Sequence, residues 1–126
     1  MIDKIALVAA GGAIGATLRY LGAAWAARLL GAGFMGTLFV NVVGSTLMGV
    51  LAVLLMEKAP GTWQRWAPLI ITGVLGGFTT FSAFSLDALY LLERGRIGAG
   101  LSYIGASVLL SIIGLYTGMV ATRALS

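Results

Sequence analysis

A stretch of the chain between residues 72 and 85 mixes glycine, hydroxyl and aromatic residues inside an apolar segment. It reads Thr-Gly-Val-Leu-Gly-Gly-Phe-Thr-Thr-Phe-Ser-Ala-Phe-Ser. Paired glycines and adjacent β-branched threonines disfavour a continuous helix, so a helix break is predicted near Gly76–Thr80. Freed carbonyl oxygens at such a break suit a hard cation, whereas freed N–H groups and hydroxyls suit an anion. These residues alone leave both chemistries open.

Phenylalanines recur every three residues in the same segment, at Phe78, Phe81 and Phe84. Such a stripe is commonly lipid-facing or part of a core. The alternative is that the ring edges, which carry partial positive charge, face a dehydrating anion without trapping it.

Further hydrogen-bond donors lie in the other apolar segments. Arg19 either anchors a helix end or supplies a fixed positive charge to a vestibule. Asn41 either bonds a neighbouring helix or donates to a passing anion. Tyr103, Ser107 and Ser111 are spaced four apart, so they share one helix face that either satisfies nearby carbonyls or lines a pore.

Acidic groups are almost absent from these segments, since Asp87 alone falls inside one, near its end. Cation pores favour acidic rings and proton-coupled carriers need titratable relays, so the inventory favours an anion. The chain has no cysteine and no histidine, which excludes thiol chemistry and the common zinc sites. No nucleophile–base constellation is visible, so an enzyme is not expected.

The elements that carry these residues are predicted to be membrane spans. Only 12 of the 126 residues are charged and 60% are hydrophobic, which is too apolar for a water-facing surface. A single all-α transmembrane domain, residues 1–126, is predicted, and its first span is expected to be retained rather than cleaved as a signal peptide. The four predicted spans cover residues 5–28, 36–56, 66–92 and 97–122. The net charge of +4 comes from scattered residues, which favours contact with membrane lipid headgroups over nucleic acid.

Two small-residue stripes, Gly11-x-x-x-Gly15 and Gly114-x-x-x-Gly118, predict that helix backbones touch. Four short helices enclose little space, so a dimer is expected. The basic residues barely favour one membrane face: Lys4, Lys58, Arg65 and Arg123 fall on one side, and Arg28, Arg94 and Arg96 on the other. A weak single orientation and a dual orientation with antiparallel self-pairing both remain open.

Taken together, these residues resemble the Fluc/CrcB fluoride channels over essentially the whole chain. Three motifs in order carry the resemblance: Gly11-Gly12-x-x-Gly15-Ala16-x-x-Arg19-Tyr20, Gly36-Thr37-Leu38-x-x-Asn41-x-x-Gly44, and Gly73-x-x-Gly76-Gly77-Phe78-Thr79-Thr80-Phe81-Ser82-x-Phe84-Ser85.

The resemblance implies a dual-topology antiparallel homodimer whose third helix is broken near its middle. It further implies two pores and a central structural sodium ion (Na+) that is not transported, held by the backbone carbonyls of Gly76 and Thr79 from each subunit. The implied function is passive, selective export of fluoride across the inner (plasma) membrane, which protects the cell from fluoride toxicity.

Carried over position by position, the resemblance also implies roles for individual side chains. The pore residues would be Asn41, Phe81, Phe84, Ser82, Tyr103, Ser107 and Ser111, with Arg19 and Thr80 in vestibule or structural roles. Two positions depart from the family pattern. Ala83 stands where threonine is common, and Asp87 stands where glutamate is frequent.

Two other functions compete with this interpretation. A small dual-topology multidrug exporter has the same size and helix count, but it needs a carboxylate deep in the first helix, where this chain has Arg19 and no acid after Asp3. A purely structural membrane protein would not require a broken helix.

Overall fold

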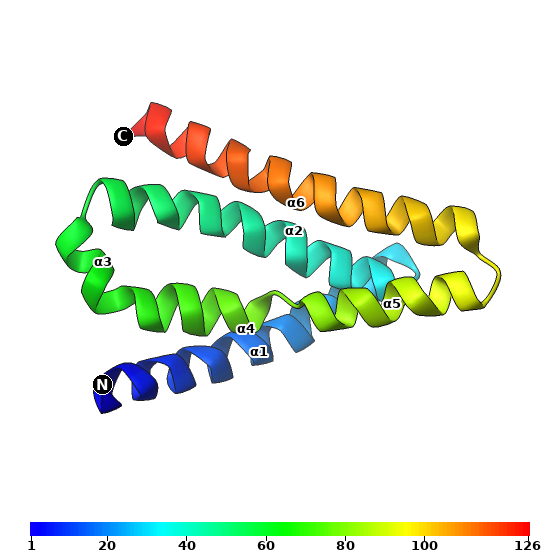
Figure 1. The fold of residues 1–126 in the computed structure, drawn as a ribbon, viewed down its shortest axis with the longest axis horizontal. Helices are drawn as coiled ribbons and strands as arrows, with labels where there is room; N and C mark the ends of the chain where they lie inside the picture. The colour runs from blue at the N-terminus through cyan, green and yellow to red at the C-terminus, as the bar shows by residue number, and fades with distance from the viewer.

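The computed structural model describes all residues, 1–126, and every element in it is helical (Figure 1). Two of the elements, η1 and η2, are π-helical, a form that is rare and usually short. In chain order the elements are α1 (Ile2–Leu30), α2 (Gly33–Leu51), η1 (Ala52–Glu57), α3 (Pro60–Ala67), η2 (Pro68–Leu75), α4 (Gly76–Phe78), α5 (Phe81–Glu93) and α6 (Ile97–Leu125).

These elements join into four helical runs that are long and apolar enough to cross a membrane: Ile2–Leu30, Gly33–Glu57, Pro60–Glu93 and Ile97–Leu125. The predicted all-helical class with four candidate spans is therefore confirmed. Each run extends past the span predicted for it, because helices continue into the interface beyond their most apolar residues.

Both termini and α3 lie at one end of the bundle, and the α1–α2 and α5–α6 turns lie at the other (Figure 1). Each of these two turns contains a glycine with positive φ, Gly31 at 83° and Gly95 at 78°. The connection between the second and third spans is shorter than predicted, since only Lys58 and Ala59 are non-helical before Pro60 begins α3. Proline suits this first helical position, where its missing N–H would have no helical partner.

Helix backbones touch along the glycine stripes, as predicted. A Cβ atom on Gly73 would lie 2.7 Å from the Cα of Gly11, which places η2 directly against α1. A Cβ on Gly118 would lie 2.5 Å from the Thr46 carbonyl oxygen, which places α6 against α2 in the same way. Small residues thus let both helix pairs approach more closely than larger side chains would allow.

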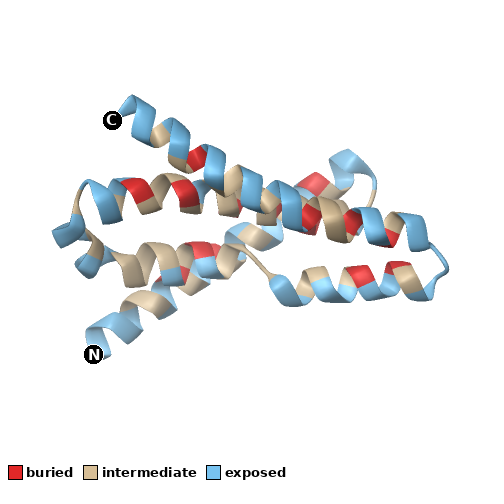
Figure 2. Cartoon of the chain, turned by 45° about the horizontal axis from the view of Figure 1, so that its top comes forward, coloured by how far each residue is buried: buried red, intermediate tan, exposed pale blue.

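Few residues of the bundle are buried, and most are intermediate or exposed (Figure 2). Many of the exposed residues are large and apolar. Of 126 residues, 17 are buried, and the exposed ones include long rows of leucine and isoleucine on α1 and α6. A bilayer is the solvent that such a surface requires.

Candidate functional site

The backbone of the third span leaves the helical conformation at two adjacent threonines. Helix α4 ends at Phe78, Thr79 (φ −93°, ψ 156°) and Thr80 (φ −151°, ψ 117°) are extended, and α5 begins at Phe81. The Thr80 hydroxyl accepts a hydrogen bond of 3.1 Å from the Ala83 N–H, which makes Thr80 the N-cap of α5.

The amide of Asn41, on α2, holds both backbone groups of Thr80. Thr80 N–H donates to Asn41 Oδ1 at 2.7 Å, and Asn41 Nδ2 donates to the Thr80 carbonyl at 3.0 Å. The Thr79 N–H still makes the ordinary helical bond to the Leu75 carbonyl, at 3.0 Å, whereas the Thr80 N–H, which would bond the Gly76 carbonyl in an unbroken helix, goes to Asn41 instead. The Gly76 carbonyl thereby loses its helical partner, while one N–H of the Asn41 amide remains available to a ligand.

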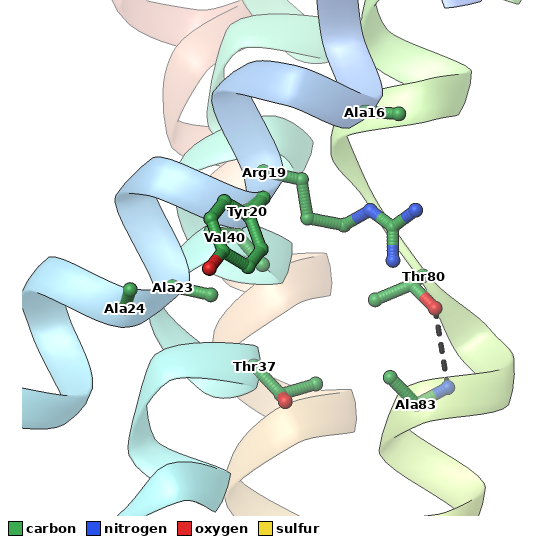
Figure 3. Close-up of a pocket in the computed structure, with 9 residues that line it drawn as sticks. All are labelled: Ala16, Arg19, Tyr20, Ala23, Ala24, Thr37, Val40, Thr80 and Ala83. Carbon is green, nitrogen blue, oxygen red and sulfur yellow. Dashed lines mark hydrogen bonds between the residues drawn. The ribbon is translucent and has the colours of Figure 1, made fainter.

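Arg19 contacts the same break from α1, whereas Asn41 contacts it from α2. Its Nε donates to the Gly77 carbonyl at 2.9 Å, across 58 residues of sequence. In Figure 3 the side chain extends from α1 toward the third span and its guanidinium points toward Thr80. Arg19 is therefore bound within the bundle, at the end of α4, and does not extend to the membrane interface.

A first cavity, here called the Arg19 cavity, has a volume of about 430 Å³ and lies between α1, α2 and α5 (Figure 3). Its polar lining consists of the Arg19 guanidinium, the Thr37 and Thr80 hydroxyls and the Tyr20 phenol, and the rest is alanine and valine. Both residues predicted for a vestibule, Arg19 and Thr80, line it. Its single charged group is positive, so the cavity attracts anions.

A second cavity, here called the Ser107 cavity, has a volume of about 310 Å³ and lies at the break, between α2, α5 and α6. No acidic residue lines it. Ser107 is 6% exposed and its Oγ atom has no hydrogen-bond partner. The lining residues are Asn41, Ser45, Thr79, Thr80, Phe81, Phe84, Ser107, Val108, Ser111 and Ile112.

Most of the residues predicted for a site meet at this second cavity, and four do not line it: Arg19, which lines the first cavity, and Tyr103, Ser82 and Gly76. Tyr103 lies one helical turn before Ser107 on α6, where its ring packs against Phe84 with 5.4 Å between the ring centroids. Ser82 is exposed, with its hydroxyl 3.3 Å from that of Thr80. Gly76 belongs to α4, just before the break. Phe81 and Phe84 pair at 5.4 Å, so the aromatic stripe continues into the cavity wall.

Sequence reasoning missed Thr37, which anchors the one acidic side chain inside a span. Its hydroxyl donates to Asp87 Oδ2 at 2.7 Å, and the Tyr103 hydroxyl lies 3.4 Å from the same oxygen. Thr37 stands one helical turn before Asn41 on α2, so helical spacing offered a signal for it. The shorter carboxylate at position 87 still reaches two hydroxyls.

The chain matches the family model described as "CrcB-like protein, Camphor Resistance (CrcB)" over residues 6–119. This protein belongs to the CrcB family. A relative from Cereibacter sphaeroides is 55% identical over 98% of this chain and 97% of its own length. Relatives from Rhizobium meliloti (51% identical, 98% and 99% covered) and Caulobacter vibrioides (44% identical, 97% and 97%) are similar throughout as well. All three are named fluoride-specific ion channel FluC.

Membership of this family and four long apolar helices make the chain a multi-pass membrane protein. The relatives are named as ion channels, not as enzymes or drug exporters. The multidrug exporter considered from the sequence is therefore not favoured.

Proposed function

We propose that this chain is a fluoride channel that lets fluoride leave the cell passively through the inner membrane and so protects it from fluoride toxicity. The observation that carries the proposal is the Ser107 hydroxyl, which is buried beside a 310 Å³ cavity with no partner of its own. A buried donor without a partner costs about 1–3 kcal/mol, so its retention is explained by a ligand that accepts its hydrogen bond.

The remaining lining of the Ser107 cavity suits a small, strongly hydrated anion. Ser111 and the free N–H of Asn41 add donors, and the Phe81 and Phe84 ring edges add weak positive potential. Several weak donors in a row can replace a hydration shell without binding the ion so tightly that it stays. A carboxylate in the lining would repel fluoride, and none is present.

A second copy in antiparallel orientation is part of the proposal, with one pore contributed by each half of the pair. The Phe81 side chain is 78% exposed although it lies at the break, in the middle of the third span. The Ser107 cavity is consequently open on one side in a single chain. A partner that covers Phe81 would close the cavity into a pore, and the even spread of basic residues at both ends permits the inverted orientation.

The break also fits the sodium ion that the family resemblance implies. Sodium would be held by main-chain carbonyl oxygens, those of Gly76 and Thr79 from both copies, and not by side chains. The loss of the Gly76 carbonyl's helical partner to Asn41 makes that oxygen available. When bound, the ion supplies positive charge that offsets the carbonyl dipoles at the dimer centre.

Proteoliposomes loaded with potassium fluoride or potassium chloride and then treated with valinomycin test the proposed function. Rapid fluoride efflux with little chloride efflux is expected. Phe81→Ile should slow fluoride efflux, because an aliphatic group has no positive ring edge. Absence of fluoride efflux, or equal efflux of both ions, would refute the proposal.

Two further measurements address assembly. Lys58→Cys in intact cells should react with an impermeant thiol reagent in about half of the molecules, whereas labelling of all or none would contradict dual topology. Replacing sodium by N-methylglucamine during reconstitution should lower fluoride efflux, and unchanged efflux would argue against a sodium requirement.

A further inference from the structure

We infer that Arg19 is a positioning residue that caps the first half of the broken third span and thereby fixes the conformation of the break. The inference concerns the hydrogen bond from Arg19 Nε to the Gly77 carbonyl. Of the two roles that the sequence left open for Arg19, it favours the hold on a helix end over the vestibule charge, and names that end as the C-terminus of α4. Only its transport readout rests on the proposed function.

Helix α1 is shaped to bring Arg19 to this carbonyl. A Cβ on Gly77 would lie 2.8 Å from the Gly12 carbonyl and 3.0 Å from the Ala16 N–H, so α4 rests directly on α1 at these small residues. Gly12, Ala16 and Arg19 follow one another at helical spacing on that face. The side chain of Arg19 thus begins one turn beyond the contact and extends along the third span to Gly77.

The end of α4 needs a partner at this point for two reasons. The Gly77 carbonyl would bond the Phe81 N–H in a continuous helix, and the extended residues Thr79 and Thr80 separate the two. A carbonyl without a partner is costly where the bilayer excludes water. The helical run from Pro60 to Phe78 also ends here with partial negative charge, which a guanidinium offsets.

Arg19 and Asn41 therefore bind different backbone groups of the break. Asn41 holds Thr80 from α2, and Arg19 holds Gly77 from α1. Fixing the residues on both sides of Thr79 determines where the Gly76 and Thr79 carbonyls point. A displaced Gly77 would disturb these oxygens and the N-cap of α5 together.

Two substitutions of Arg19 separate its hydrogen bond from its charge. In Arg19→Gln the Nε2 donor lies the same number of bonds from Cα as arginine Nε, so the bond to Gly77 can persist without charge. Arg19→Met has the same length and no donor. Arg28→Gln and Arg28→Met are matched controls, because Arg28 is exposed in the last turn of the same helix.

Hydrogen exchange followed by mass spectrometry on peptides spanning residues 77–85 is the direct readout, with peptides from α6 as the reference for global unfolding. Arg19→Met should speed exchange at the break about tenfold or more over α6, while Arg19→Gln stays within about threefold of the unsubstituted protein. If the Met variant does not fold, the Gln variant decides. The inference would be overturned if Arg19→Gln speeded exchange at the break tenfold or more, or if Arg19→Met left it unchanged.

Fluoride efflux provides the second readout. Capping predicts that the Gln variant retains most of its efflux and the Met variant loses about tenfold, with little dependence on salt. A role through charge alone predicts equal losses in both variants, and a decline in the unsubstituted protein as ionic strength rises. An unsubstituted protein without fluoride efflux would refute the proposed function and leave the exchange result to stand or fail by itself.

Discussion

Replacing Ser107 with alanine should stabilise the protein and slow fluoride movement at once. Ser107 is 6% exposed and belongs to the lining of the 310 Å³ cavity, and its buried Oγ atom lacks a hydrogen-bond partner. The substitution removes a desolvated hydroxyl that has no partner within hydrogen-bond distance, although the Tyr103 phenol lies near it on the same helix face. Burying a hydroxyl without a partner costs about 1–3 kcal/mol, which is the upper bound of the expected gain in unfolding free energy. Water inside the cavity would lower that gain toward zero.

The effect on fluoride has the opposite sign and can be estimated in the same way. A hydrogen bond to a charged ligand contributes about 1.5–3 kcal/mol, which corresponds to a roughly tenfold to hundredfold change in rate if the bond is lost at the barrier. Neighbouring donors such as Ser111 compensate in part, so a loss of about tenfold is expected. Ser107→Thr, which keeps the hydroxyl, should retain more efflux than Ser107→Ala.

Thermal unfolding in detergent and valinomycin-triggered fluoride efflux from proteoliposomes measure the two quantities on the same preparations. Ser102→Ala is the matched control, because Ser102 is exposed on the same helix and should change neither. A lower unfolding temperature with unchanged efflux in Ser107→Ala would refute the reasoning. That outcome would mean the hydroxyl serves only to satisfy a neighbouring group.

Three other substitutions are expected to separate the break from the rest of the bundle. Asn41→Asp removes the Nδ2 donor to the third span and brings a negative charge to the cavity, so it should lower both the unfolding temperature and fluoride efflux. Gly77→Ala places a Cβ 2.8 Å from a carbonyl oxygen of α1 and should cost about 1–3 kcal/mol of unfolding free energy, unlike Gly98→Ala, whose Cβ meets nothing within 4 Å. Glu57→Gln weakens an exposed ion pair with Arg123 and should leave the unfolding temperature and the efflux unchanged; a clear loss in either would show that this pair is more than a surface contact.

The helices could be predicted because a bilayer imposes one strong rule on the sequence. Backbone groups must bond within each span, so long apolar runs with few charges identify the spans directly. The contacts of Gly11 and Gly118 followed from the same reasoning, since small residues in a membrane helix mark close backbone approach. The π-helical segments η1 and η2 were not predicted, because no residue type specifies an i→i+5 bonding pattern.

The partners of the site residues could not be predicted from the same patterns. For Arg19 a helix-end anchor and a vestibule charge both stayed open, and for Asn41 an interhelical bond and donation to an anion; the structure engages both with main-chain groups of the third span, 58 and 39 residues away. These pairings depend on the relative register of packed helices, which hydropathy does not encode. Antiparallel pairing and the sodium ion stay predictions, since they concern a second copy.

The division of backbone groups at the break links those two predictions. Asn41 satisfies both groups of Thr80 and Arg19 satisfies the Gly77 carbonyl, which leaves the Gly76 carbonyl without the helical partner that it would otherwise have. In the middle of a bilayer no water is present to bond this carbonyl. An antiparallel partner would bring the Gly76 and Thr79 carbonyls of the other copy close to those of this chain. The combined negative potential of the carbonyl oxygens would then favour a bound cation. We therefore expect sodium and the partner to stabilise each other: removing sodium should weaken the dimer, and a variant that cannot dimerise should lose its response to sodium.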